Sequence, residues 1–252
     1  MKNKLVTALA AVLAAGLAAW GGYVFCTQVN LAELYALIPV YVILVFLGAF
    51  FEQLVHEGAH FLVGAICKMG VKAPKLRLFR SSCVEVNPKG AKAMRLRFAL
   101  TAAAGLFFDL LLILLGVIAF AVPSVHPLFG IALPYAFYSF VINAAPLEYS
   151  GGKTDGFVIC EILSKAPSSK VLLAILRVQG LVNGGLPLKD VEEGMLIDLP
   201  QLPEDDINFI ILTQLRYEYY LAKGDDSTAY KYFLRYQDVI RYLPEGYKDG
   251  KK

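Results

Sequence analysis

Four long apolar stretches constrain the fold of this chain more than any other feature. They cover residues 5–25, 39–66, 98–122 and 128–147. Each meets or approaches the length of about 20 apolar residues that a helix needs to cross a bilayer. The whole chain is 57% hydrophobic and only 18% charged, which is unusual for a soluble domain. We therefore predict an all-α polytopic membrane protein with about four transmembrane helices.

The first apolar stretch is either a retained membrane anchor or a secretory signal peptide. It follows the basic start "MKNK", as a signal peptide would. Its apolar run is longer than the roughly 7 to 15 residues of a signal core, and no good cleavage box follows. We therefore expect an N-terminal membrane anchor over residues 1–30.

The basic residues between the apolar stretches predict how the chain is oriented. Residues 68–97 carry nine lysines and arginines, whereas residues 26–38 and 123–127 carry none. Cytosolic loops of membrane proteins are enriched in lysine and arginine. We therefore expect the 68–97 segment, the N-terminus and everything after Ser150 in the cytosol, in a multi-pass protein of a bacterial or archaeal cell membrane.

The charge and the cysteines argue against two other classes of protein. The net charge is only +3, and the basic residues do not form a strip suited to phosphates, so we expect no nucleic acid partner. The four cysteines show no C-x-x-C pairing. They suggest neither a disulfide framework nor a thiolate zinc site.

The second apolar stretch contains the polar sequence "EQLVHEGAHFLVGA" at residues 52–65. His56 and His60 are four residues apart, so they lie about 40° from each other on one helical face and can bind the same ion. Glu57 lies close enough to hold a water on that ion. This H-E-x-x-H pattern is typical of sites in which neutral imidazoles bind zinc and the glutamate takes a proton from the attacking water.

So short a pattern also arises by chance, but the membrane setting favours a function. A charged group in the middle of a membrane helix costs about 2.5 to 3.5 kcal/mol on insertion scales, and such residues usually carry a function. Glu52, one turn before His56, either hydrogen-bonds to a ligand histidine or sits in a hydrated pocket. Gly48 and Gly64 lie on the same helical face as these residues, one at each end of a row spaced by four residues. Small residues at these positions would let neighbouring helices approach closely.

A catalytic zinc usually needs a third protein ligand, which must come from elsewhere in the chain. Pro146 breaks the fourth stretch, and glycines 151 and 152 permit a turn. Irregular backbone at membrane depth is tolerated where it lines a cavity, as at an active site. Depth alone does not choose among the acidic candidates, which are Asp109, Glu148, Asp155 and Glu161.

These motifs resemble those of the site-two protease family of intramembrane zinc metalloproteases. The resemblance covers about residues 40–160 and rests on "HEGAH" within a membrane helix and on "NAAPLEYSGGKTDG" at residues 143–156. It implies one zinc ion per chain, held by Asp155 together with His56 and His60. It also implies that Asn143 is a catalytic polar group near the substrate carbonyl or the zinc-bound oxygen. Glu57 is the catalytic base that the H-E-x-x-H pattern predicts.

Some positions depart from the family pattern and indicate a divergent branch. The family tends to have glycine-proline-x-x-asparagine at the start of its next core helix, where this chain has "GLFFD" from Gly105 to Asp109. Thr154 stands where the family usually has leucine. We expect Asp109, like Glu52, to support the metal ligands from behind or to bind substrate.

Between the second and third stretches, "KLRLF" at 75–79 and "CVEV" at 83–86 predict a small cytosolic β-hairpin. In the family that the chain resembles, a sheet in this position is thought to receive the substrate as an added strand. The alternative is a basic loop held against anionic lipid headgroups, and the two interpretations do not exclude each other.

The composition becomes more polar towards the C-terminus, and residues 168–252 are predicted to be a cytosolic helical region. Two helices are expected over 206–223 and 227–243, because Gly224 is a stop signal and Asp225 and Asp226 are start signals. The spacing resembles one tetratricopeptide unit, and a single repeat cannot form a solenoid. We expect a hairpin that caps this region or docks a cytosolic protein.

The predicted order is therefore the anchor, a metalloprotease core over residues 31–167 and the cytosolic region over 168–252. The core would end in a short apolar helix, "GFVICEIL" at residues 156–163.

Together these features predict an intramembrane zinc endopeptidase that cuts transmembrane or membrane-anchored proteins or peptides near the cytosolic face. One alternative is a zinc-binding membrane scaffold or regulator without proteolytic activity, although a structural zinc needs no glutamate base. A transporter that uses Glu52, Asp109 and the histidines as a relay is another, but four spans without an internal repeat are few for a transporter.

Overall fold

The computed structural model describes residues 2–28, 34–71, 86–149 and 152–243. Four of its segments are long and apolar enough to cross a membrane. They are α1 (Lys2–Gln28), α2 (Leu34–Ile66), α3 (Met94–Ala121), and η1 (Pro127–Gly130) followed by α4 (Leu133–Ala144). The remaining helices are α5 (Asp155–Leu163), α6 (Pro167–Val182), η2 (Leu188–Asp190), α7 (Gly194–Ile197), α8 (Ile207–Lys223), α9 (Asp226–Val239) and η3 (Ile240–Tyr242). The prediction of a mostly helical chain with about four membrane-length helices is confirmed.

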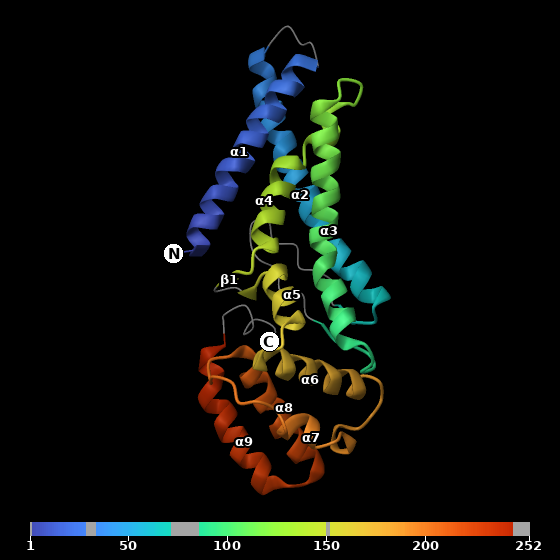
Figure 1. The fold of residues 1–252 in the computed structure, drawn as a ribbon, viewed down its shortest axis with the longest axis vertical. Helices are drawn as coiled ribbons and strands as arrows, with labels where there is room; N and C mark the ends of the chain where they lie inside the picture. Colours follow the sequence, from blue (N-terminus) through green and yellow to red (C-terminus); the bar gives the residue numbers. More distant parts are fainter. Residues whose placement is uncertain (1, 29–33, 72–85, 150–151, 244–252) are drawn as a thin grey trace.

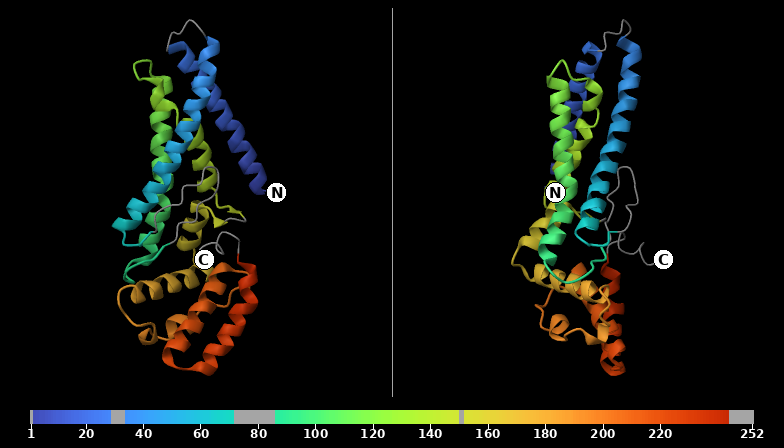
Figure 2. Two further views of the ribbon diagram at one scale, coloured as in Figure 1. Left: turned by 180° about the vertical axis from the view of Figure 1, so that it is seen from behind. Right: turned by 90° about the vertical axis from the view of Figure 1, so that its right-hand side faces the viewer.

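The long helices occupy one end of an elongated molecule, and α6 to α9 form the other end (Figure 1). Within the long-helix end, α2 packs along α3, α3 packs on α4, and α1 packs on α4 (Figure 2). Large apolar side chains remain exposed on the outer faces of α2 and α3, including Phe46, Phe50, Phe107 and Leu114. A continuous apolar surface of this kind is typical of lipid contact, which indicates a membrane protein.

The fourth apolar stretch differs from the continuous helix predicted over 128–147. It begins as the short 3-10 helix η1 and continues as α4, which ends at Ala144. Pro146 has no backbone N–H and cannot extend the helix. The chain then forms an antiparallel pair of two-residue strands, β1 (Glu148–Tyr149) and β2 (Gly152–Lys153). This second hairpin was not predicted, and it leads directly into α5.

The hairpin predicted over 75–79 and 83–86 lies outside the described residues, apart from Val86, which is not in a strand. It therefore stays a prediction.

The C-terminal helices follow the sequence signals closely. Helices α8 and α9 match the two predicted helices, and α5 matches the predicted short helix. Gly224 ends α8 in the left-handed conformation, with φ 78°, which glycine adopts without steric cost. The Asp225 carboxylate then accepts a hydrogen bond from the Thr228 backbone N–H at 3.0 Å and caps α9.

Helix α6 joins the two ends of the molecule. One set of its side chains, Val171, Ile175 and Val178, enters the core formed with α7, α8 and α9. A second set, Leu173 and Leu176, packs with Met69, Met94 and Ile162 beneath the long helices. The predicted division at residue 168 therefore falls within a continuously packed part of the chain.

Arg97 fixes the connection between α2 and α3. Its guanidinium group donates hydrogen bonds to the backbone carbonyls of Cys67, Lys68, Lys89, Gly90 and Lys92, at distances of 2.5 to 3.2 Å. These carbonyls belong to the end of α2 and to the turn that precedes α3. A planar guanidinium with five N–H donors can bridge them all, whereas a lysine ammonium has only three donors on one atom.

We expect Arg97→Lys to lower the free energy of unfolding by about 2 kcal/mol and the unfolding temperature in detergent by roughly 4 to 8 °C. Arg95→Lys is the matched control, because the Arg95 side chain is exposed, and it should leave the unfolding temperature unchanged. Equal unfolding temperatures for the two variants would contradict this role of Arg97.

Candidate metal centre

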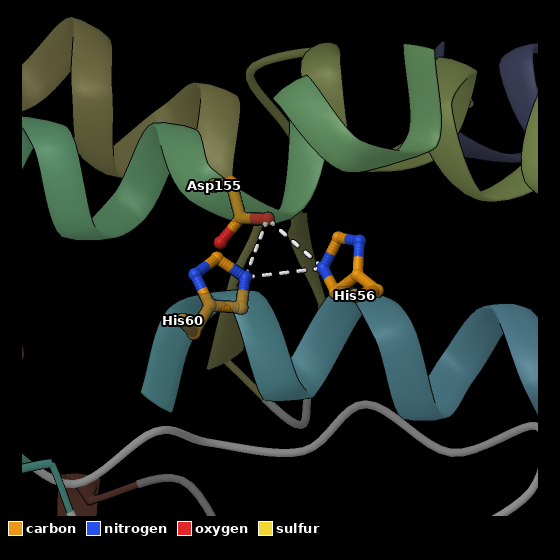
Figure 3. A group of neighbouring side chains, drawn as sticks. All are labelled: His56, His60 and Asp155. Carbon is orange, nitrogen blue, oxygen red and sulfur yellow. Dashed lines mark hydrogen bonds and ion pairs between the residues drawn. The ribbon is translucent and has the colours of Figure 1, made fainter. Parts of the chain in front are cut away.

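His56 and His60 lie one turn apart on the buried face of α2, with 6% and 4% of their surface exposed. Their Nε2 atoms are 3.1 Å apart, and the ring planes meet edge-on at 75°. Figure 3 shows both rings projecting from α2 towards the same point. The four-residue spacing in the sequence therefore produces the shared face that was predicted.

Helix α3 holds both rings through their Nδ1 atoms. His60 Nδ1 donates to the backbone carbonyl of Thr101 at 2.7 Å, and His56 Nδ1 donates to Oδ2 of Asp109 at 2.9 Å. A carbonyl oxygen can only accept, so Nδ1 of His60 carries the hydrogen, and a carboxylate imposes the same on His56. In the neutral form of each ring the lone pair is therefore on Nε2, which faces the other ring.

Asp155, the first residue of α5, completes the group from the opposite side (Figure 3). Its Oδ2 atom lies 3.3 Å from Nε2 of His56 and 3.3 Å from Nε2 of His60. The Asp155 carboxyl group thus places one oxygen against both Nε2 atoms.

The spacing of these three atoms fits a tetrahedral zinc ion. Their separations are 3.1, 3.3 and 3.3 Å. Two ligands at 2.0–2.1 Å from zinc and at tetrahedral corners lie about 3.3 Å from each other. Three electron-pair donors that converge in a buried site are stabilised by a proton or a metal ion between them. His56, His60 and Asp155 therefore form a group that could hold a metal ion, as two nitrogen ligands and one oxygen ligand.

Gly105 of α3 leaves room for a metal ion beside the two Nε2 atoms. A Cβ atom at Gly105 would lie 2.6 Å from Nε2 of His56 and 2.6 Å from Nε2 of His60, so it would stand against the converging lone pairs. Any larger side chain would meet the same two atoms. The absence of a side chain here lets α3 lie close to the histidines without filling the space beside their Nε2 atoms.

The contacts between α2 and α3 follow two rows of four-residue steps that run antiparallel. On α3, Thr101 contacts His60, and Asp109 contacts His56. Gly105 lies between them, against the Nε2 atoms of both histidines. Neither Thr101 nor Gly105 was predicted to be a site residue. Their spacing from Asp109 on one helical face was the signal that could have identified them.

The prediction that small residues at Gly48 and Gly64 permit close approach is confirmed. A Cβ atom at Gly48 would stand 2.5 Å from the Ile131 carbonyl oxygen, and one at Gly64 would collide with Val71 and lie 3.3 Å from Thr101.

The other predicted site residues lie around the group without joining it. Glu57 is buried on α2 directly after His56, and Glu52 is buried one turn before it. Asn143 lies in the last turn of α4, where its Nδ2 donates to Oγ of Ser139 at 3.2 Å. Of the alternative third ligands, Glu161 pairs with Lys153 at 2.9 Å, and Glu148 lies opposite Lys153 in the hairpin.

Thr154 and Gly156 hold Asp155 in place from both sides. The Thr154 hydroxyl donates to the Ala145 carbonyl at 2.6 Å and accepts from the backbone N–H of Phe157 at 3.3 Å, which caps α5. Gly156 packs directly on the last carbonyls of α4, where a Cβ atom would collide with the Ala144 carbonyl. The start of α5 is thereby fixed against the end of α4.

Comparisons of this chain with protein families, with curated proteins and with solved structures gave no match. Its function must therefore be inferred from its own residues.

We expect Gly105→Ala to abolish zinc binding, because the added methyl group would stand against both Nε2 atoms. The zinc content of the purified protein should fall from about one ion per chain to near zero. Gly58→Ala is the matched control on α2, since a Cβ atom there meets nothing within 4 Å, and it should keep its zinc. Equal zinc contents for the two variants would contradict the packing described here.

The two acids near the histidines should differ in their effect on metal binding. Asp155→Ala removes an oxygen that faces both Nε2 atoms, and it should lower zinc affinity far more than Asp109→Asn. The asparagine carbonyl can still accept the His56 Nδ1 hydrogen, so Asp109→Asn should cost about tenfold or less. A chelator competition assay measures both values, and a larger loss for Asp109→Asn would exclude Asp155 as the ligand.

Proposed function

We propose that this protein is an intramembrane zinc endopeptidase that cleaves transmembrane or membrane-anchored proteins or peptides. The observation that carries the proposal is the convergence of His56, His60 and Asp155, at the separations of tetrahedral zinc ligands, between helices of membrane length. The resemblance of residues 40–160 to the site-two protease family supports it.

The three ligand side chains leave the fourth position of a tetrahedral site to water or substrate, which is the pattern of catalytic zinc. A zinc ion held by His56, His60 and Asp155 would act as a Lewis acid that polarises the peptide carbonyl and makes the attacking water more acidic. The α3 contacts to Nδ1 orient both rings and place the hydrogen of the neutral form on Nδ1, so that Nε2 is the atom that would bind the metal.

Glu57 is the proposed general base. It follows His56 on α2, about 60° round the helix from His60, and its side chain is buried. Its carboxylate would accept a proton from the water as the water oxygen bonds to the peptide carbon. The protonated carboxyl group would then return that proton to the amine as the C–N bond breaks. No proton is lost or gained over the cycle.

The setting between membrane-length helices determines the class of substrate. A transmembrane substrate helix already uses its carbonyls in hydrogen bonds, so it must unwind locally before one can reach the site. Helix-breaking residues near the cleaved bond are therefore expected. Asn143, at the end of α4, is proposed to contact the substrate carbonyl with its amide group, which would release Ser139.

We propose that the site faces the cytosol. The start of α1, the end of α2 and the C-terminal helices all lie towards the same end of the long axis (Figure 1), and the basic 68–97 segment favours the cytosolic side for that end. Basic residues there would contact anionic lipids, and the α8–α9 hairpin is available for a cytosolic partner. Protease protection in sealed vesicles tests this orientation.

The decisive test is Glu57→Gln in the purified full-length chain, assayed against a panel of single-span substrates. The amide cannot accept a proton, so cleavage should fall by at least about 100-fold, while zinc content stays that of the wild type. Glu148→Gln, a change of the same kind at an exposed residue, is the control and should retain activity.

Two outcomes would overturn the proposal in different ways. Cleavage by Glu57→Gln near the wild-type rate would exclude Glu57 as the base. Zinc without cleavage in the wild type across the panel would favour the scaffold or regulator.

A further inference from the structure

A largely buried ion pair lies next to the turn that presents Asp155. Lys153, the last residue of β2, precedes Asp155 by two residues, and its Nζ atom is 3.0 and 2.9 Å from the two carboxylate oxygens of Glu161. The side chains of Lys153 and Glu161 are 14% and 7% exposed. Lysine and glutamate are rarely this buried unless they are paired. Within the described residues, this is the most buried ion pair that a lysine or arginine forms.

The pair joins the two elements between which Asp155 lies. Lys153 belongs to β2, whereas Glu161 lies in the second half of α5. The Lys153 ammonium group also lies 4.8 Å from the centre of the Phe157 ring, one turn before Glu161 on α5, which is a cation–π distance. Asp155 stands where the strand enters the helix. The direction of its side chain therefore depends on how these contacts hold β2 against α5.

Helix α8 anchors the same pair from the C-terminal end of the molecule. Asn208, in the first turn of α8, is buried, and its Nδ2 donates to Oε1 of Glu161 at 3.2 Å. The Asp206 carboxylate accepts from the backbone N–H of Asn208 at 2.7 Å and fixes the start of α8. A cavity of about 500 Å³ opens between the two helices, lined by Phe157 and Ile207 among others. Beside this cavity, the hydrogen bond from Asn208 connects α8 to α5.

Stability alone does not explain why the pair is charged. Taking two charges out of water costs free energy that their attraction often only repays, and an apolar pair of similar size is frequently as stable. An apolar pair has no directional contacts, however. The Glu161 carboxylate accepts hydrogen bonds from Lys153 of β2 and from Asn208 of α8. The polar arrangement therefore adds orientation.

We propose that Glu161 is a positioning residue for the third metal ligand. Its carboxylate holds Lys153 of β2 and Asn208 of α8, and the strand fixed in this way directs the Asp155 carboxyl group towards the two histidines. The chain of contacts thus runs from the C-terminal helices through α5 to the strand that precedes the ligand. The inference rests on the proposed function, because it assumes a metal ion at the histidines and Asp155.

The test replaces the ion pair by an apolar pair of similar size in the purified full-length chain. Lys153→Met together with Glu161→Leu leaves no unpaired charge, so the fold should be kept while the directional contacts are lost. Lys223→Met together with Glu193→Leu is the matched control, because that pair has the same N–O distance of 2.9 Å but lies among the C-terminal helices. Zinc affinity is measured by chelator competition. The unfolding temperature of the metal-free protein in detergent reports the fold.

We expect the apolar pair at 153 and 161 to weaken zinc binding about tenfold or more, with the unfolding temperature kept. The control pair should bind zinc like the wild type. Lys153→Arg keeps the charge and can donate to both oxygens of Glu161, so its zinc affinity should stay within about threefold of the wild type. Wild-type zinc affinity in the folded apolar-pair variant would overturn the inference, since the ion pair would then serve folding alone. An equal loss in the control pair would also overturn it.

A second variant decides the question if the apolar pair does not fold. Asn208→Leu is similar in size, keeps both charges of the ion pair and removes only the hydrogen bond from α8. Its zinc affinity should fall about three- to tenfold, less than for the loss of a direct partner of a ligand. Wild-type zinc affinity in Asn208→Leu would then overturn the inference.

These results are separable from a failure of the proposed function. A wild-type protein that binds no zinc would refute the proposed endopeptidase. A wild-type protein that binds zinc, together with unchanged zinc affinity in the variants of Lys153, Glu161 and Asn208, would refute the role of Glu161 alone.

Discussion

The close packing of α2 on α3 is the constraint on which the rest of the site depends. An imidazole placed in a membrane-length helix must find partners inside the protein, because lipid offers none. Here α3 supplies them in antiparallel register: the Thr101 carbonyl for His60 and the Asp109 carboxylate for His56. This register requires the helices to approach so closely that Gly105 lies against both Nε2 atoms. The same contact that satisfies the rings also fixes their tautomer, so one interface both stabilises the helix pair and orients the two Nε2 atoms.

Asp155, the proposed third ligand, lies outside that interface and reaches it by a different route. Helix α4 stops at Ala144, and the chain turns through the β1–β2 hairpin before Asp155 opens α5. An acid at the first turn of a helix also benefits from the partial positive charge of the helix N-terminus. Thr154 and Gly156 secure this turn against the end of α4. The site therefore combines a helix pair with a short irregular segment, and α6 supports both by packing beneath Met69, Met94 and Ile162.

The sequence predicts those parts that depend on periodicity and on local signals. Hydropathy identified the long helices, the four-residue spacing placed His56 and His60 on one face, and Gly224 with Asp225 marked the turn between α8 and α9. Asp155 was selected only through the family resemblance. Depth in the membrane does not distinguish it from the other acidic residues, and the composition of a turn does not predict where the turn directs the chain. Thr101 was missed for a simple physical reason: it contributes a backbone carbonyl, which every residue has. Gly105 was missed as a site residue because the space it leaves depends on the helix packed against it.

The places where the chain departs from the site-two protease pattern have structural explanations of their own. With Leu106 in place of proline, α3 continues through Gly105 without losing a backbone N–H. Asp109 therefore stands one turn beyond Gly105 on the same face, in register with His56. An asparagine there could accept the same hydrogen, but it would bring no negative charge to the ring. Thr154, where leucine is usual, supplies the hydroxyl that caps α5 and ties it to Ala145. The departures from this pattern thus lie beside His56, His60 and Asp155, where each departing residue has a contact of its own to make.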